Sequence, residues 1–423
     1  MHAALPPDAE HTAEALSAAA RAAARLLAGA SPAAKDRALA GAAAGLRAAS
    51  ERLLAANRDD VERTRAAGES SAFLDRLTLS PARVAAMAAG VEEVVGLPDP
   101  VGETIAGWRR PNGLEIAQVR VPIGVVFSIY ESRPNVTADS AALCLKTANA
   151  VLLKGGSESQ ATSGVIADVF RGAIAEAGLP PDAVQLVTGG REVTRGLLRR
   201  DDRIDVVIAR GGEALKRTIL EESRIPVIKH FEGICHVYVD ASADADMAER
   251  IVLNAKVQRP SVCNAIENLV VHEAAAPAFV PRIARALRAN GCELRGDAAV
   301  RALVPEVVPA TDADWDTEYL DLILSIRVVP SLEEAIAFIG RHGTGLAEAI
   351  VTTDVRAADR FLHGVDAAAV FVNASTRFTD GFEFGFGAEV GISTNRLHAR
   401  GPMGLRELTT YKYLVRGDGQ VRG

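Results

Sequence analysis

GVVFSIY at residues 124–130 opens a series of apolar runs that continues with AVLLK (150–154), VQLVTG (184–189), IDVVIARGG (204–212) and VIKHF (227–231). The runs are rich in β-branched residues, and a helical pattern lies between consecutive runs. Such alternation is typical of parallel strands joined by crossover helices. The sequence therefore predicts an α/β protein with an open, doubly wound sheet.

The segments on either side of this series have patterns of their own. From about Ala9 to Gly96, Ala, Leu and Arg recur at helical spacing, and Ser31 and Ser80, each followed by Pro, are expected helix N-caps. A second α/β stretch begins near Asn254 and ends near Ser375. Its predicted strands are AIENLVVH (265–272), LILSIRVV (322–329), EAIVTT (348–353) and AAVFVNA (368–374).

Two further β patterns have no evident core to enter. One is a hairpin from about Gly102 to Arg120, and the other is the alternating run LTTYKYLVR at residues 408–416. Because an isolated two-stranded hairpin is marginal in water, we expect it to find a third strand.

Composition excludes several classes of protein. The 423 residues carry a formal net charge of −7, which argues against binding to nucleic acid or to an anionic membrane surface. The N-terminus lacks the pattern of a signal peptide, and no apolar run reaches membrane-spanning length. The four cysteines show no CxxC spacing, so neither a zinc site nor a disulfide framework is expected. A cytoplasmic protein without a metal is the resulting prediction.

Glycine pairs follow three of the predicted strands: Gly155-Gly156, Gly189-Gly190 and Gly211-Gly212. Glycines at the junction of a strand and a helix allow the backbone to approach a phosphate, and the helix N-terminus favours an anion. The strict GxGxxG and GxxxxGK[ST] motifs are absent, so tight turns remain the alternative.

Cys263 is the candidate nucleophile. It precedes the predicted strand AIENLVVH in a loop whose basic residues, Lys256 and Arg259, would favour a thiolate. A small buried hydrophobic residue is the alternative for any lone cysteine, and it is favoured for Cys144, Cys235 and Cys292.

Several of these segments together resemble the γ-glutamyl phosphate reductase family of the aldehyde dehydrogenase superfamily, from about residue 10 to the C-terminus. The resemblance is carried by VPIGVVFSIYESRPNVTADSAALCLKTANAVLLKGGSES (121–159), IPVIKHFEGICHVYVD (225–240), NAKVQRPSVCNA (254–265), DWDTEYLDLILSIRVV (314–329), NASTRFTDG (373–381) and GISTNRLHARGPMGLRELTTYK (391–412).

The resemblance implies three domains. The expected cofactor domain comprises residues 1–101, 122–253 and 376–399, the catalytic domain residues 254–375, and an oligomerisation arm residues 102–121 and 400–423. In relatives such an arm reaches a neighbouring subunit, so a homodimer or larger homo-oligomer is expected.

The sequence departs from the family pattern in two places. Leu346 and Ala347 replace the usual His-Thr pair, which puts substrate contacts near that loop in doubt, and Ala209 replaces a proline.

The implied mechanism has Cys263 attack the acyl carbon of γ-glutamyl phosphate. The oxyanion would be held by the Cys263 backbone N–H and by Asn135, with Ser132 as the alternative. His230 stands where hydrolytic aldehyde dehydrogenases carry a glutamate base, which favours phosphate over water as the acyl acceptor. A purely structural histidine is the other interpretation.

The cofactor implied is NADPH. Lys154 resembles the superfamily lysine that binds the adenosine ribose, and Ser157 replaces an acid that would repel a 2′-phosphate, although Glu158 is adjacent. Glu318 resembles the glutamate that holds the nicotinamide ribose. The remaining candidates for cofactor binding are Gly155, Gly156, Gly189, Arg210, Gly211 and Gly212.

The substrate carries both a phosphate and a carboxylate. Arg133, Arg259, Arg377 and Arg400 are candidates for anion contacts, and Asn373 and Ser375 for the amino-acid end. Two other functions remain open: a hydrolytic NAD(P)-dependent aldehyde dehydrogenase, and a non-catalytic companion of glutamate 5-kinase. The same kinase is a possible partner of an active reductase.

Overall fold

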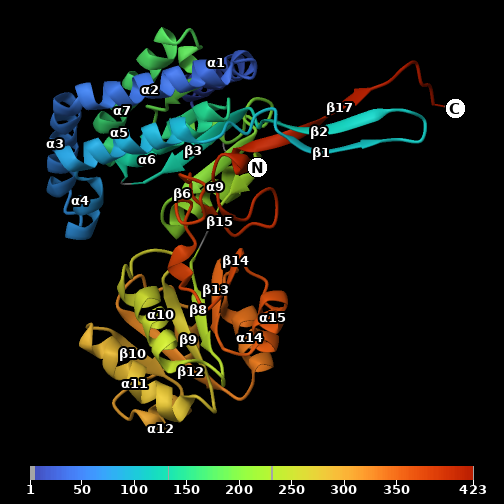
Figure 1. Cartoon of the computed structure of the whole chain (residues 1–423). Helices are drawn as coiled ribbons and strands as arrows, with labels where there is room; N and C mark the ends of the chain where they lie inside the picture. The colour runs from blue at the N-terminus through green and yellow to red at the C-terminus, as the bar shows by residue number, and fades with distance from the viewer. Residues whose placement is uncertain (1–4, 132, 230–231, 423) are drawn as a thin grey trace. The chain divides into compact units, whose positions relative to one another are not determined.

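The computed structural model describes residues 5–131, 133–229 and 232–422. The chain forms two compact units (Figure 1). The first comprises Met1–Lys229, Gly385–Gly391 and Met403–Gly423, and the second comprises His230–Phe384 and Ile392–Pro402. Within the described residues no helix is both long and apolar enough to cross a membrane.

The first unit contains a five-stranded parallel sheet in the order β5-β4-β3-β6-β7. Its strands are β3 (Val125–Tyr130), β4 (Ala150–Lys154), β5 (Val184–Leu186), β6 (Val206–Arg210) and β7 (Val227–Ile228). The helices that follow strands are α6 (Pro134–Lys146), α7 (Gln160–Glu176), α8 (Arg191–Leu197) and α9 (Glu213–Glu222), with short 3₁₀ turns η1 (Ser157–Ser159) and η2 (Pro181–Ala183). The chain moves outward from β3 on one side and returns to β6 on the other. The predicted doubly wound sheet is therefore confirmed, with its switch point between β3 and β6.

Helices from the N-terminal region pack beside this sheet. They are α1 (Pro7–Leu27), α2 (Pro32–Ala48), α3 (Ser50–Ala66), α4 (Ser71–Leu77) and α5 (Pro81–Gly96). Ser31 and Ser80 accept hydrogen bonds as N-caps, as predicted, and Ser70 caps α4 in the same way. Gly45 allows close approach of α2 to α7, because a Cβ there would lie 2.7 Å from Cγ1 of Val169.

The predicted hairpin and the C-terminal run form one antiparallel sheet (Figure 1). β1 (Thr104–Arg109) pairs with β2 (Glu115–Pro122), and β2 pairs along its whole length with β17 (Thr409–Arg416). The third strand therefore comes from the tail of the same chain. Every residue of β1 is exposed, as are those of β17 after its first residue.

The second unit contains a seven-stranded parallel sheet in the order β11-β10-β12-β9-β8-β13-β14. Its strands are β8 (Cys235–Val239), β9 (Ile266–His272), β10 (Glu293–Gly296), β11 (Val308–Pro309), β12 (Ile323–Val329), β13 (Ala347–Val351) and β14 (Ala369–Val372). The four predicted strands are β9, β12, β13 and β14.

Helices cover both faces of this sheet. They are α10 (Ala245–Val257), α11 (Ala276–Ala289), α12 (Ala298–Leu303), α13 (Asp312–Trp315), α14 (Leu332–His342) and α15 (Val355–Gly364). Val237 and Val239 of β8 enter the core under α10 and α11, whereas Tyr238 enters the opposite core with Phe338 and Phe361. The alternation of strand side chains thus fills two cores from one sheet.

The remaining elements lie near the C-terminus: η3 (Thr376–Phe378), β15 (Ile392–Ser393), β16 (Gly401–Pro402) and η4 (Arg406–Leu408). The boundaries of the two units differ from those of the domains expected from the sequence. β8 and most of α10 were expected in the cofactor domain, but both elements belong to the second unit. The assignment of three functional domains stays a prediction.

Candidate active site

Cys263 lies in the loop between α10 and β9 of the second unit. It is half-buried, whereas Cys144, Cys235 and Cys292 are buried thiols. Burial raises the pKa of Cys144 to about 12 and that of Cys292 to about 11, and it raises the pKa of Cys235 well above its ordinary value. Because the thiolate is the reactive form, these three cysteines are poor nucleophiles.

Two predicted substrate residues accompany Cys263. Burial lowers the pKa of Arg377, as does the nearby charge of Arg259, while Cys263 acts in the opposite sense. Arg377 also donates from Nε to Oε1 of Gln258, at 2.9 Å, in the loop that carries the cysteine. The structure therefore brings Cys263, Arg259 and Arg377 together.

Lys256, a basic neighbour of Cys263 in the sequence, has a partner of its own. It is fully buried and its Nζ lies 2.5 Å from Oε2 of Glu267, so it is engaged in a buried ion pair. Sequence proximity did not reveal this pairing with Glu267, and the positive potential of Lys256 at the cysteine stays a prediction.

The segment after β14 is tied to the cysteine loop. Thr376 donates from Oγ1 to the carbonyl of Asn264 at 2.7 Å, and Ser375 accepts from the N–H of Arg377 as the N-cap of η3. The side-chain amide of Asn373 makes two 2.9 Å bonds with the backbone of Thr352. Thr376 thus supports the cysteine loop, Ser375 caps η3 and Asn373 binds the chain after β13. Contacts of Ser375 and Asn373 with substrate stay predictions.

Glu318 lies in the loop between α13 and β12. Its Oε1 accepts the N–H of Gly233 at 2.9 Å. Gly233 in turn packs directly on Cys263, because a Cβ at this position would clash with the Cys263 carbonyl. Gly233 therefore links the nucleophile Cys263 to Glu318, the glutamate predicted to hold the nicotinamide ribose.

The glycine pairs of the first unit gather at one edge of its sheet. Gly155-Gly156 follows β4, Gly189-Gly190 follows β5 and Gly211-Gly212 follows β6. The carboxyl ends of parallel strands share an edge, and α8 and α9 begin directly after two of the pairs. This edge offers backbone N–H groups suited to phosphates.

Lys154 and Glu158 flank the first glycine pair. Burial lowers the pKa of Lys154 and the charge of Glu158 opposes this, while Nζ donates to the carbonyl of Gly155 at 3.0 Å. Ser157 opens η1 between them. The lysine is thus held at the strand end as the resemblance implies, with a carboxylate beside it.

Glu131 is a residue of this edge that the sequence patterns did not indicate, although it lies within the quoted segment 121–159. Its Oε2 accepts the N–H of Gly212 at 2.7 Å, so the carboxylate caps the N-terminus of α9. A carboxylate there takes the position that an anionic ligand would favour. The only signal in the sequence was its place directly after β3.

Asn135 lies in the first turn of α6 and donates from Nδ2 to Oδ2 of Asp139 at 3.1 Å. Burial raises the pKa of Asp139 to about 6, opposed by the charge of Arg210. Asp139 thus interacts with both Asn135 and Arg210. Arg133 is exposed just before α6, and Ser132 and His230 lie outside the described residues.

The departures from the family pattern are buried. Leu346 and Ala347 have no exposed surface and pack in the core of the second unit. Ala209 is buried in β6 opposite Ile129.

Arg400, a candidate for an anion contact, forms an ion pair with Asp366, with 2.6 Å between Nη1 and Oδ1. Within the described ranges, no three His, Cys, Asp or Glu side chains are arranged to hold a metal.

Comparison with known proteins shows the family of the chain. The model of the aldehyde dehydrogenase family matches residues 3–293 and 288–413. The chain is similar to γ-glutamyl phosphate reductases of Moorella thermoacetica (55% identical, 95% of this chain and 97% of that protein) and Thermobifida fusca (56%, 92% and 93%).

A crystal structure of γ-glutamyl phosphate reductase from Thermotoga maritima aligns with a TM-score of 0.95 at 45% identity, over 97% of this chain and 100% of that one. The fold of this chain is thus that of a solved relative. The chain belongs to the aldehyde dehydrogenase family of nicotinamide-dependent oxidoreductases, among the γ-glutamyl phosphate reductases.

Proposed function

We propose that this chain catalyses the NADPH-dependent reduction of γ-glutamyl 5-phosphate to glutamate 5-semialdehyde and phosphate, the second step of proline biosynthesis from glutamate. The substrate is suggested by the name of the M. thermoacetica relative, which is 55% identical. The observation that carries the chemistry is the setting of Cys263, a half-buried thiol beside Arg259 and Arg377.

The arginines attract a substrate that bears a phosphate and a carboxylate. The Cys263 thiolate forms a bond to the acyl carbon, and the bond between that carbon and the phosphate oxygen breaks, so that phosphate leaves with the electron pair. The backbone N–H of Cys263 is the expected oxyanion donor, and Asn135 in this role rests on the resemblance alone. When bound, NADPH supplies the hydride that reduces the thioester. Release of the aldehyde breaks the carbon–sulfur bond and restores the thiolate.

The residues at the sheet edge of the first unit fit a nicotinamide dinucleotide. Glycine pairs and helix N-termini suit its phosphates, and Lys154 suits a ribose hydroxyl. We infer NADPH rather than NADH because Ser157 can donate to a 2′-phosphate, while Glu158 would weaken the preference. Glu131 must release the N-terminus of α9 for a phosphate to bind there.

Substrate contacts by Arg133, Asn373 and Ser375, a cytoplasmic location, a homo-oligomer and an association with glutamate 5-kinase complete the proposal. They rest on the resemblance and on the sequence patterns described above.

One assay tests the proposal and separates it from its alternatives. Purified protein is given glutamate semialdehyde and NADP⁺, with and without inorganic phosphate, and formation of NADPH is followed by absorbance. We expect reduction of NADP⁺ only when phosphate is present. Reduction without phosphate would indicate a hydrolytic aldehyde dehydrogenase, and none under either condition would indicate a non-catalytic protein.

A further inference from the structure

Lys256 and Glu267 form an ion pair with no solvent exposure on either side chain, and Nζ lies 2.5 Å from Oε2. Lys256 belongs to the last turn of α10 and Glu267 to β9. The loop between these elements carries Cys263. The ion pair therefore closes the base of the nucleophile loop.

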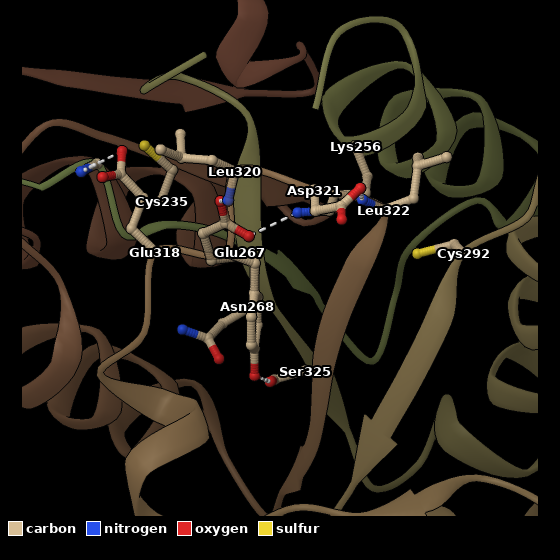
Figure 2. Close-up of polar contacts among 12 residues, drawn as sticks. Cys235, Lys256, Glu267, Asn268, Cys292, Glu318, Leu320, Asp321, Leu322 and Ser325 are labelled. Atoms are coloured by element: carbon tan, nitrogen blue, oxygen red, sulfur yellow. Dashed lines mark hydrogen bonds and ion pairs between the residues drawn. The ribbon is translucent and has the colours of Figure 1, made fainter. Parts of the chain in front are cut away.

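The same two side chains also hold the loop of Glu318. Oε1 of Glu267 accepts the N–H of Leu320 at 3.3 Å, and Nζ of Lys256 lies 5.9 Å from the centre of the Tyr319 ring. Leu320 has a φ of 53°, a left-handed conformation that a leucine adopts only when its surroundings impose it. Figure 2 shows the Glu267 carboxylate among Lys256, Leu320 and Glu318.

Glu318 connects the loop that Glu267 holds to the nucleophile Cys263. Its carboxylate accepts the N–H of Gly233, which packs on the carbonyl of Cys263. The contacts form a closed circuit from Glu267 through Leu320, Glu318 and Gly233 to Cys263. Each member of the circuit belongs to the second unit.

We propose that the Lys256–Glu267 pair is a positioning device that sets Cys263 and Glu318 relative to each other, with the acceptor oxygen of Glu267 as its essential part. This inference rests on the proposed function for the roles of Cys263 and Glu318. A buried ion pair is a weak source of stability, since an apolar pair of similar volume often stabilises a protein equally well. An apolar pair could not hold the Glu318 loop in the same position, because it has no acceptor for the Leu320 N–H.

The test compares two double variants that both remove the charges. Lys256→Met/Glu267→Gln keeps a carbonyl acceptor for Leu320, and Lys256→Met/Glu267→Leu removes it. Lys35→Met/Asp99→Asn is the control, because buried Lys35 of α2 also pairs with a carboxylate, that of half-buried Asp99, with 2.6 Å between Nζ and Oδ2, and this pair lies in the first unit.

Three quantities are measured on each protein: the kcat and KM of phosphate-dependent NADP⁺ reduction, the rate at which iodoacetamide alkylates Cys263, and the midpoint of thermal unfolding. We expect the Leu-containing double variant to lose about tenfold or more in kcat, because small displacements of catalytic groups are costly. Its alkylation rate should fall about threefold or more, in keeping with the loss of one buried hydrogen bond. The Gln-containing double variant and the control should keep both rates near those of the unmodified protein.

Equal rates in the Gln and Leu double variants, at similar unfolding midpoints, would overturn the proposal. So would losses that follow the unfolding midpoint across all three proteins. If the Leu-containing variant does not fold, Lys256→Met/Glu267→Asn replaces it, since the shorter amide withdraws the acceptor. Alkylation needs no substrate, so it tests the positioning role even if the unmodified protein shows no phosphate-dependent turnover, a result that would reject the proposed function instead.

Discussion

At the scale of single residues, burial separates the four cysteines more sharply than their sequence neighbourhoods do. Cys144 and Cys235 are fully buried and Cys292 nearly so, whereas Cys263 is partly exposed on a loop. The sequence pointed to Cys263 through its basic neighbours, yet one of these, Lys256, is paired with Glu267. Arg377, which is distant in sequence, also interacts with the thiol.

Cofactor preference also depends on single residues. Ser157→Glu adds a second carboxylate beside Glu158, near the expected position of the 2′-phosphate. Like charges about 4 Å apart near a protein surface repel by up to about 4 kcal/mol before screening. We therefore expect the ratio of kcat/KM for NADPH to that for NADH to fall by about tenfold or more. Steady-state kinetics with both cofactors would measure it, and an unchanged ratio would mean that Ser157 does not face the 2′-phosphate.

At the scale of elements, Asp314 anchors the start of α13 and the Tyr319 side chain. Its carboxylate accepts from the N–H and Oγ1 of Thr311, from Arg295 at 2.6 Å and from the Tyr319 hydroxyl at 2.9 Å. Burial acts to raise the pKa of Asp314, but these bonds together hold it well below its ordinary value of 3.8.

The lowered pKa of Asp314 makes the stability of the fold depend on pH in a definite direction. The folded state favours the ionised carboxylate, so its contribution is present above the unfolded-state pKa of 3.8 and is lost as the pH falls below that value. Asp314→Asn should cost about 1–3 kcal/mol at neutral pH and should lessen the loss of stability below about pH 4. Urea unfolding at several pH values would measure both effects. Parallel pH profiles for variant and unmodified protein would contradict this account.

Elements with a strong periodic pattern could be predicted, and short ones could not. The apolar runs became β3, β4, β5, β6 and β7, and the same reasoning found β9, β12, β13 and β14. β10 and β11 are too short to show a period, and β8 lay in a stretch attributed to the preceding domain.

In the candidate site, the sequence predicted Cys263 and the glycine pairs because each follows or precedes a recognisable strand. It could not predict that Glu267 pairs with Lys256, that Glu131 caps α9 or that Asp139 binds Asn135. These contacts depend on which side chains the folded sheet brings together, and periodicity carries no such information.

At the scale of the whole molecule, the arm is a three-stranded sheet whose outer strands β1 and β17 are exposed. Trp108 of β1 and Tyr413 of β17 pack edge to face with ring centres 6.1 Å apart, yet both remain largely exposed. An exposed sheet with aromatic residues is a common interface between subunits.

Removal of residues from Thr409 onward should therefore disturb assembly. The deletion takes away the strand that pairs with all of β2 and exposes its hydrogen-bonding edge. We expect the unmodified protein to be a dimer or larger oligomer and the truncated protein to form aggregates or inactive monomers. Light scattering coupled to size-exclusion chromatography would show this. An unmodified protein that is monomeric at micromolar concentration would contradict it, as would a truncated protein that stays oligomeric and active.

The central claim is that the thiol of Cys263 carries the acyl group, and the most direct test is the kcat of Cys263→Ser beside its affinity for NADPH. We predict a loss of about a thousandfold or more in kcat, since a serine hydroxyl near neutral pH is a far weaker nucleophile than a thiolate. NADPH binding, measured by its fluorescence, should stay near that of the unmodified protein. A kcat within tenfold of the unmodified enzyme would contradict the assignment of the nucleophile.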